Sequence, residues 1–460
     1  MQENTSIEEL VKKQRAFFET KATFSVSFRT EKLKQLKQAI LDNEDAINEA
    51  LQKDLKKSSF ETFMVEIGMV VSDMSYIIKH MKKWAKKKYV STPISQFPST
   101  SFIMPEPFGV TLVMSPWNYP FMLCLEPMVG ALAAGNTCIL KPSAYSSTTS
   151  DVIAKIIAEV FEEEYVAVVK GGREENQTLL EQRFDYIFFT GGVKVGKYVM
   201  EMASKNLTPI TLELGGKSPC IIDKTADLKV AADRIAFGKY LNSGQTCVAP
   251  DYLLIDSSVK KEFLTYFKKS VVKMYGEDAF ANQDYPKMIN LKHYNRVKGL
   301  IVGEEVVFGA KYKEETLQIA PTVLENITEN SKIMQEEIFG PVLPVITVAN
   351  MEEAEAFVRK YEKPLAFYLF STDKKTIDRF VREVSFGGGC INDTIIHLAS
   401  SKMGFGGVGA SGMGSYHGKN SFDTFTHYKG VIKKSNKLDL PFRYQPYNKV
   451  KEKLIRIFLR

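Results

Sequence analysis

The sequence lacks paired cysteines and recognisable metal-ligand spacings. Its 460 residues include 5 cysteines and 5 histidines, and none of them forms a CxxC or HExxH pattern. An odd number of widely spaced cysteines argues against a disulfide framework and favours a reducing compartment. Without close pairs of histidine or cysteine, no metal is expected. These absences exclude a disulfide-stabilised secreted scaffold and a zinc enzyme with the common ligand motifs.

The sequence also lacks an export signal and an uninterrupted apolar span. The first residues, MQENTSIEELVKK, contain no basic region followed by an apolar one, so no secretory signal is expected. Residues 107–125 carry no charge and are almost long enough to cross a bilayer. However, Pro107, Pro116 and Pro120 interrupt them, which favours a strand, a turn and a helix. The chain is therefore predicted to be cytoplasmic.

What is present is the composition of an ordinary globular protein. The chain is 44% hydrophobic and 25% charged, and its length exceeds that of a single hydrophobic core, so two or three domains are expected. The formal net charge of +7 is attributed to scattered lysines. Because no basic stripe with interleaved aromatic residues is seen, no nucleic-acid partner is predicted.

Short apolar runs alternate with helical patterns over most of the chain. Ser6 and Glu9 form a candidate capping box for an N-terminal helix. Two series of βαβ units follow, which predict parallel sheets covered on both faces. The expected strands are residues 110–115, 137–142, 165–172 and 186–192, and then residues 220–224, 252–256, 341–348 and 366–371. Residues 405–418 are dense in glycine, so a loop packed closely against other backbone is expected there.

Three residues could carry covalent chemistry. Cys247 lies in the string GQTCVAP, where Gly and Pro predict a turn that presents the thiol, and a thiolate is a strong nucleophile. Glu213, in LELGGK, is a carboxylate among apolar residues and a candidate base. Asn118, in MSPWNYP, could donate its amide to an oxyanion. Each also has an ordinary structural explanation, as a buried small side chain or a turn residue, so these residues alone leave both interpretations open.

A glycine turn in FTGGVKVGK, residues 189–197, follows a predicted strand and opens a predicted helix. Such turns direct backbone N–H groups at phosphates. The string resembles a P-loop, but Tyr198 stands where Ser or Thr is required, and GGKS at residues 215–218 lacks its upstream glycine. GASGM ends in Met413, which disfavours a serine hydrolase. A nucleotide site of another kind or a structural turn remains.

Taken together and in order, the motifs closely resemble those of the aldehyde dehydrogenase superfamily. The matching strings are PWN (116–118), LKP (140–142), FTGG (189–192), LELGGKSP (212–219), GQTC (244–247), EEIFGP (336–341) and GFGGVGASGMG (404–414). They cover roughly two-thirds of the chain, and their conjunction is far more specific than any one of them. GQTCVAPDY and GMGSYHGKNSFDTFTH are most similar to the class 3 and fatty aldehyde dehydrogenase branch.

The resemblance implies an NAD(P)-dependent oxidation of aldehydes to carboxylic acids. Cys247 would form a thiohemiacetal and then a thioester, Asn118 and the Cys247 N–H would hold the oxyanion, and Glu213 would activate water. The implied cofactor-binding residues are Trp117, Lys141, Gly191, Gly192, Gly196, Glu337 and Phe339. Among these, Lys141 would contact the adenosine ribose, Glu337 the nicotinamide ribose and Phe339 the nicotinamide. Many NAD-preferring members carry an acid where Ala144 stands, so NAD with tolerance for NADP is expected, without a metal.

The resemblance also implies an α/β fold with a Rossmann-like coenzyme domain, an α/β catalytic domain and a small β bridging element. The expected limits are residues 1–79 and 99–212 for the coenzyme domain, 213–414 for the catalytic domain, and 80–98 with 415–432 for the bridging element that pairs across a homodimer. Residues 433–460 form a C-terminal tail. Residues 447–460 place apolar side chains on one helical face, which either packs within the dimer or makes a weak contact with a membrane surface.

The substrate class and two rival functions follow from the same resemblance. Tyr119, Met122 and Ile395 are expected to line a pocket for medium- or long-chain aliphatic or aromatic aldehydes. An acylating dehydrogenase that uses coenzyme A is the first rival, and the presence of Glu213 disfavours it. A non-catalytic binding or structural protein on the same fold is the second, and the intact set of Cys247, Glu213, Asn118 and Glu337 argues against it.

Overall fold

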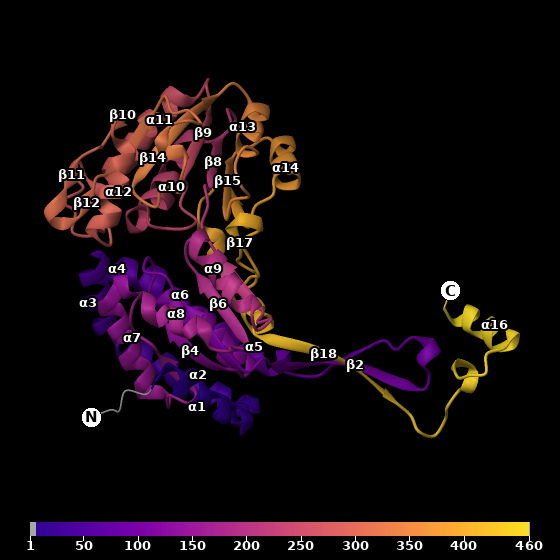
Figure 1. Cartoon of the computed structure of the whole chain (residues 1–460). Coiled ribbons are helices and arrows are strands. Elements are labelled where there is room, and N and C mark those ends of the chain that lie inside the picture. Colours follow the sequence, from indigo (N-terminus) through magenta and orange to yellow (C-terminus); the bar gives the residue numbers. More distant parts are fainter. Residues whose placement is uncertain (1–5, 460) are drawn as a thin grey trace.

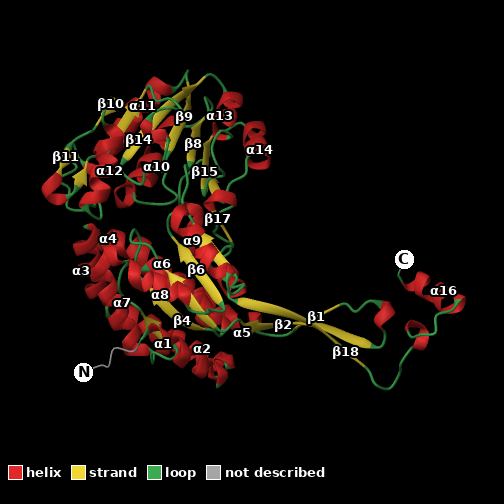
Figure 2. Ribbon diagram, in the orientation of Figure 1, coloured by secondary structure: helices red, strands yellow, loops and turns green. Residues whose placement is uncertain are grey.

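The computed structural model describes residues 6–459, which form two α/β lobes and a long arm (Figure 1; Figure 2). Residues 1–5, the start of the segment in which no export signal is expected, and the last residue of the tail lie outside the described residues. The predicted capping box is confirmed: Ser6 Oγ accepts from Glu9 N at 3.2 Å, and Glu9 Oε2 accepts from Ser6 N at 3.1 Å. It begins α1 (Ile7–Glu19).

The N-terminal lobe is built on a six-stranded sheet of order β17-β7-β6-β3-β4-β5. Its strands are β3 (Val110–Met114), β4 (Thr137–Lys141), β5 (Val166–Val168), β6 (Tyr186–Thr190), β7 (Ile210–Glu213) and β17 (Gly412–Met413). The neighbours are parallel except β17, which is antiparallel to β7. The helices of this lobe, besides α1, are α2 (Val26–Asp42), α3 (Glu44–Leu55), α4 (Ser59–Thr62), α5 (Gly68–Trp84), α6 (Met122–Ala134), α7 (Ser147–Val160), α8 (Arg173–Glu181) and α9 (Val193–Ser204). All five residues of each of β3, β4 and β6 are buried, as continuous apolar strands in a covered parallel sheet should be.

The second lobe has a seven-stranded sheet of order β10-β13-β14-β9-β8-β15-β16. Its strands are β8 (Pro219–Ile222), β9 (Tyr252–Asp256), β10 (Glu305–Phe308), β13 (Thr322–Glu325), β14 (Val342–Val348), β15 (Ala366–Phe370) and β16 (Gly388–Ile391), with a separate pair of β11 (Tyr312–Lys313) and β12 (Gln318–Ile319). The helices are α10 (Leu228–Tyr240), α11 (Lys260–Tyr275), α12 (Leu291–Ile301), α13 (Met351–Val358) and α14 (Lys374–Glu383). Only the pairing of β10 with β13 is antiparallel in this sheet. Both predicted series of strands are thus confirmed.

The arm is a three-stranded antiparallel sheet that leaves the two lobes (Figure 1). It consists of β1 (Lys88–Val90), β2 (Ser99–Pro107) and β18 (Thr426–Lys434), which follows α15 (Lys419–Thr424), and α16 (Lys449–Phe458) lies at its outer end. The sheet therefore includes residues 99–107 and 433–434 as well as parts of the predicted bridging ranges. The domain limits themselves stay a prediction.

The glycine-rich segment has the structure that the sequence predicts. Residues 405–418 run mostly without regular structure, as predicted, apart from a 3₁₀ turn and the short β17. A Cβ at Gly412 would lie 2.1 Å from Leu212 O, so glycine is what allows the two backbones to approach this closely.

The expected origin of the net charge in scattered lysines is wrong. Residues 433–460 contain nine Lys and Arg and two Asp and Glu, a net charge of +7 that equals the charge of the whole chain.

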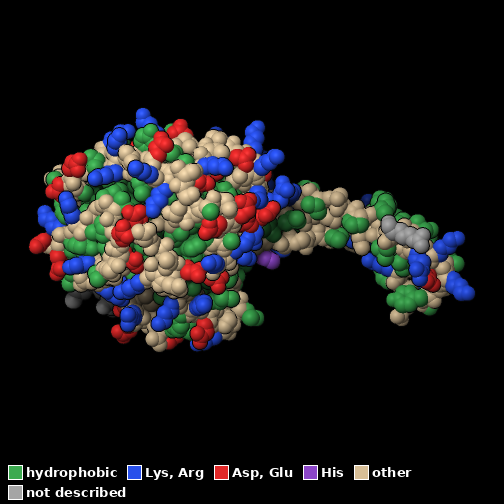
Figure 3. All heavy atoms as spheres, turned by 90° about the horizontal axis from the view of Figure 1, so that it is seen from above, with side chains coloured by type: hydrophobic (Ala, Val, Ile, Leu, Met, Phe, Trp, Pro, Cys, Tyr) green, Lys and Arg blue, Asp and Glu red, His purple; other side chains and the backbone are tan. Residues whose placement is uncertain are grey.

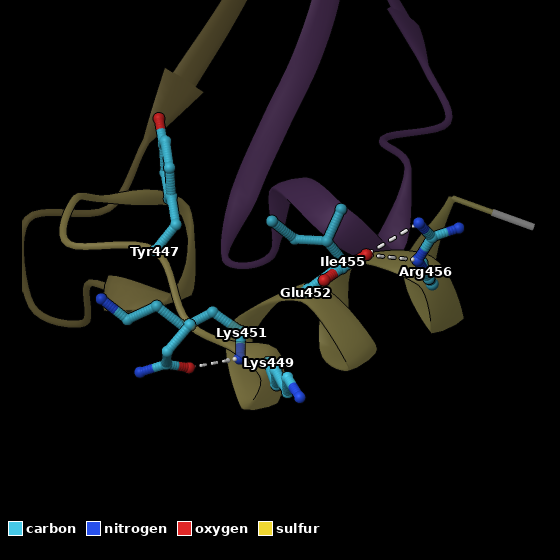
Figure 4. A pocket seen from close by; sticks show the side chains of 7 residues that line it. Tyr447, Lys449, Lys451, Glu452, Ile455 and Arg456 are labelled. Carbon is cyan, nitrogen blue, oxygen red and sulfur yellow. Dashed lines mark hydrogen bonds and ion pairs between the residues drawn. The ribbon is translucent and has the colours of Figure 1, made fainter.

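The basic side chains of the tail lie over the outer end of the arm (Figure 3). There α16 borders an open groove of about 550 Å³, with Lys449, Lys451 and Arg456 around Ile455 (Figure 4). Arg456 pairs with Glu452 at 2.7 Å, while Val450 and Ile457 of the same helix are exposed. Among the described residues, none of the helices has the length and apolar character to span a bilayer.

Candidate active site

Cys247 lies where two cavities meet, and it lines both of them. It follows a tight 3₁₀ turn, Leu241–Gly244, in which Asn242 and Ser243 adopt left-handed φ values of 51° and 54°. A Cβ at Gly244 would lie 2.3 Å from Gly340 O, so this position requires glycine. The turn leaves the thiol half-buried between the lobes.

The first cavity is polar at its reactive end and has a volume of about 200 Å³. Seven of the predicted site residues line it together with Cys247, and they are Trp117, Asn118, Gly191, Gly192, Glu213, Glu337 and Phe339. They come from the ends of β3, β6 and β7 in one lobe and from the EEIFGP loop of the other. The structure thus brings together residues separated by more than two hundred positions.

The remaining two predicted site residues, Lys141 and Gly196, do not line this cavity. Lys141 lies at the end of β4, where its Nζ donates to Pro142 O at 2.9 Å and Gly171 O at 2.8 Å, and burial lowers its pKa. Gly196 lies inside α9, and a Cβ there would lie 2.7 Å from Leu214 Cδ2. In this structure Gly196 therefore lets α9 pack closely against the residue that follows Glu213.

The ionisable groups of the first cavity are all shifted toward their neutral forms. Burial raises the pKa of Cys247 to about 12, with further contributions from Glu337 and Glu213. Burial raises the pKa of Glu213 well above its ordinary value. Burial and the nearby charge of Asp251 raise the pKa of Glu337 to about 8. A cavity that removes water from a thiol and two carboxyl groups disfavours every one of their charges.

The carboxylate of Glu213 has neither Oε1 nor Oε2 bonded to a partner within the described residues, although it is buried. A buried polar group without a hydrogen-bond partner destabilises the folded state, so its presence points to a function. The Glu337 side chain lies close against the backbone at Gly215, where only glycine leaves room for it, since a Cβ at Gly215 would lie 2.1 Å from Glu337 Oε2. Asn118 Nδ2 donates to Gln245 O at 3.0 Å, two residues before Cys247. This bond uses one of the two N–H groups of the amide.

The second cavity has a volume of about 190 Å³ and an apolar wall. The expected pocket residues Tyr119, Met122 and Ile395 line it beside Cys247. The other lining residues come from five regions of the chain: Met64, Val65, Met69, Leu123, Phe237, Leu241, Thr246, Val248, Ile396, Leu398, Ala399, Phe405, Tyr416 and His417. The hydroxyls of Tyr119 and Thr246 share a hydrogen bond of 2.6 Å. Such a wall suits an apolar molecule that places one polar group at the sulfur.

Several of these residues were missed by the sequence reasoning. His293, at the start of α12, lines the first cavity, and its ring lies 4.9 Å from that of Trp117. Burial and the neighbouring cations Arg296 and Lys292 lower the pKa of His293 to about 4, so it is neutral near pH 7. Met64 and Val65 lie in a π-helical turn, Phe63–Ile67, whose sequence carries no signal of a cavity wall.

The residues of the first cavity fit a nicotinamide coenzyme. The buried hydroxyl of Thr190 has no partner within the described residues, and it lies at the β6 end next to Gly191. The next element, α9, begins at Val193, and its N-cap Gly192 has no side chain. Val195 N and Gly196 N donate to Gly192 O, and the N–H groups before them in the first turn can meet an anion. Residues 6–459 contain no group of three or more His, Cys, Asp and Glu side chains placed to hold a metal.

Comparison with known proteins decides the family. A sequence model described as the aldehyde dehydrogenase family matches residues 1–431. The chain belongs to this family. Its α/β fold is that of aldehyde dehydrogenases, and it is an NAD(P)-dependent aldehyde dehydrogenase.

Individual relatives cover nearly the whole chain. The 4,4'-diaponeurosporen-aldehyde dehydrogenase of Staphylococcus aureus is 49% identical over 97% of this chain and 97% of its own length. The dimeric NADP-preferring aldehyde dehydrogenase of Rattus norvegicus is 46% identical over 94% of this chain and 95% of its own. A solved structure of Staphylococcus aureus AldH in a substrate-bound state superposes with a TM-score of 0.97 at 48% identity, covering 99% of this chain and 100% of that one. The predicted similarity to the class 3 branch is confirmed.

Proposed function

We propose that this chain oxidises apolar aldehydes to carboxylic acids through a thioester on Cys247. The observation that carries the proposal is the place of Cys247, which borders both a polar cavity that fits the coenzyme and an apolar cavity that fits the aldehyde. Cys247→Ser should abolish turnover and leave coenzyme binding intact. Unaltered turnover in that variant would overturn the role of the thiol as nucleophile.

The residues act in a fixed order. Cys247 releases its S–H proton to solvent, and Sγ bonds to the carbonyl carbon of the aldehyde while the π pair of the C=O bond moves to oxygen. The Asn118 amide and the Cys247 N–H hold this negative oxygen. The oxidised nicotinamide supplies the hydride acceptor when it is bound. Glu213 then takes a proton from water, the oxygen of that water bonds to the thioester carbon, and the C–S bond breaks. Within the described part of the chain both carboxyl oxygens of Glu213 lack a hydrogen-bond partner, which supports its role as this base.

For the coenzyme, we assign Trp117, Gly191, Gly192, Glu337 and Phe339 to the nicotinamide and phosphate end. Lys141 is assigned to the adenosine ribose, since the carbonyls of Pro142 and Gly171 take two of the three N–H donors of its ammonium group, and Gly196 supports the helix that faces the pyrophosphate. NAD is the proposed coenzyme with NADP tolerated, since the exposed Ala144 puts no carboxylate near a 2′-phosphate. Steady-state kcat/KM with each coenzyme tests this, and a rate with NADP below about a thousandth of that with NAD refutes it.

For the substrate, the apolar wall supports medium- or long-chain aliphatic or aromatic aldehydes. The relative from Staphylococcus aureus is named for a diaponeurosporen aldehyde, which is consistent with an apolar substrate. Rates across an aldehyde chain-length series test the proposal. The acid should be released without coenzyme A, and dependence on coenzyme A would instead indicate the acylating reaction.

We propose a homodimer that pairs through the arm, with the coenzyme, catalytic and bridging domains at the limits given above. An arm that extends from the lobes and exposes Tyr89, Ile94 and Ile432 is poorly stabilised in a lone chain, and a relative is named as dimeric. Deleting residues 433–460 and measuring molar mass by light scattering tests the contribution of the tail. Sedimentation with anionic liposomes tests the alternative of a membrane contact. Equal sedimentation of the full and shortened chains would refute that alternative.

A further inference from the structure

One short segment, Lys57–Glu66, reaches both loops of the reaction centre. It carries three charged side chains that are buried, Lys57, Glu61 and Glu66, and two of them are fully so. Lysine and glutamate are almost never fully buried unless they are paired. The segment lies outside both cavities except for Met64 and Val65, which line the apolar one. Its buried charges are not part of the reaction described above.

Lys57 and Glu66 form an ion pair that holds the Trp117–Met122 turn at both ends. Lys57 Nζ pairs with Glu66 Oε1 and donates to Asn118 O at 3.0 Å, and it lies 4.0 Å from the ring centroid of Tyr119. Glu66 Oε2 accepts from Phe121 N at 3.1 Å and Met122 N at 2.9 Å. The turn is thus fixed through its carbonyl at one end and through its N–H groups at the start of α6.

The loop of the nucleophile is attached to the same segment. Glu61 Oε1 accepts from Asn242 N at 3.0 Å, and Asn242 Nδ2 donates to Asn118 O at 2.8 Å. Asn118 O therefore accepts from both Lys57 and Asn242, while its side chain donates to Gln245 O. Asn242 adopts a left-handed conformation, which asparagine tolerates better than most residues.

We infer that Lys57 and Glu66 are positioning residues: their buried ion pair fixes the backbone of Asn118 and thereby aims its side-chain amide at the oxygen on the substrate carbon next to Cys247. This inference rests on the proposed role of Asn118. The reasoning is geometric, because an amide that stabilises an oxyanion must lie within hydrogen-bond distance of where that charge develops. A backbone held from two sides leaves the side chain few alternatives.

The test is a double-mutant cycle on kcat. Lys57→Met with Glu66→Gln removes both charges of the pair, and the glutamine oxygen can still accept from Met122 N. Glu61 loses the nearby cation but keeps the hydrogen bond from Asn242 N. We expect this variant to lower kcat by up to about 10²-fold, the loss typical of a missing oxyanion donor. In an Asn118→Ala background the same two substitutions should change kcat by no more than about 2-fold, because the amide they position is gone. Coenzyme affinity and the rate at which iodoacetamide alkylates Cys247, read by peptide mass spectrometry, should stay at the wild-type values.

Phe380→Ala provides the matched control. Phe380 is a fully buried residue of α14 in the other core, and its loss lowers the melting temperature without touching the site. An equal loss of kcat in this control would overturn the inference, as would a change confined to KM. The inference would also be overturned if the loss of kcat caused by Lys57→Met with Glu66→Gln adds in full to the loss caused by Asn118→Ala. If Asn118→Ala alone leaves kcat unchanged, the proposed function of Asn118 fails instead, so the two failures are distinguishable.

Discussion

Replacing Glu213 by glutamine is expected to separate formation of the thioester from its hydrolysis. Within residues 6–459 the carboxylate makes no hydrogen bond, and it is buried, so an amide of the same shape breaks no contact. What is lost is the base. A positioned general base is worth about 10²–10⁴ in rate, which corresponds to roughly 3–5 kcal/mol of activation free energy.

Rapid mixing of the Glu213→Gln enzyme with aldehyde and NAD should show one equivalent of NADH per active site, followed by a steady rate that is about 10²–10⁴ times lower than in the wild type. Intact-mass spectrometry should find the acyl group on Cys247. Cys247→Ser should give no burst at all. A wild-type steady rate in Glu213→Gln, or loss of the burst together with the steady rate, would refute the assignment of Glu213 to hydrolysis.

The pH dependence gives a second test of the same residue. A base works in its deprotonated form, and burial raises the pKa of Glu213 well above its ordinary value. The hydrolysis rate of the wild type should therefore rise with pH through a midpoint well above that of an exposed glutamate. Glu213→Gln should lack this rise. An equal rise in both enzymes would assign the titration to another group.

Three further predictions concern coenzyme choice, the pH dependence of stability and substrate length. Ala144→Glu should lower kcat/KM for NADP about 30-fold relative to Ala144→Gln, because a carboxylate ~4 Å from a doubly charged phosphate in water costs about 2 kcal/mol; equal values would show that position 144 is remote from the 2′-phosphate. Burial raises the pKa of Glu337 from 4.5 to about 8 in the folded chain. The free energy of unfolding is therefore highest below pH 4.5, where Glu337 is protonated in both states, and it falls as the pH rises to 8. Denaturant unfolding at several pH values should show that the free energy of unfolding of Glu337→Gln lacks this fall, which is up to about 5 kcal/mol in the wild type. The same pH profile in both proteins would contradict the prediction. Met64→Ala enlarges the apolar wall and should shift the preferred aldehyde toward longer or bulkier chains, whereas an unchanged chain-length profile would exclude Met64 from substrate contact.

The elements that sequence predicted correctly are those set by local patterns. The strands β3, β4 and β6 are continuous apolar runs, and such runs are typical of parallel strands covered on both faces. The capping box at Ser6 involves residues three apart, so it is readable from sequence. The motifs around Cys247 and Glu213 could be read because their order along the chain is specific, although their roles stay proposals.

What sequence could not predict depends on packing between distant segments. Nothing in the string around Met64 indicates that a π-helical turn will face a cavity with Ile395 and Tyr416. The backbone contacts of Lys141 likewise depend on Gly171, thirty residues away. The concentration of positive charge in residues 433–460, by contrast, is a property of the sequence itself. Tertiary contacts complete the local signals at Met64 and Lys141.

The position of the thiol also sets a condition on how it becomes reactive. Burial raises the pKa of both central residues, which strengthens Glu213 as a base once it is deprotonated but hinders ionisation of the Cys247 thiol. Desolvation by itself therefore does not ionise the thiol. The described residues that line the polar cavity include no lysine or arginine, and His293 there is neutral near pH 7. Because none of these residues supplies a cation, any positive charge that lowers the pKa of Cys247 has to come from outside the residues that line this cavity.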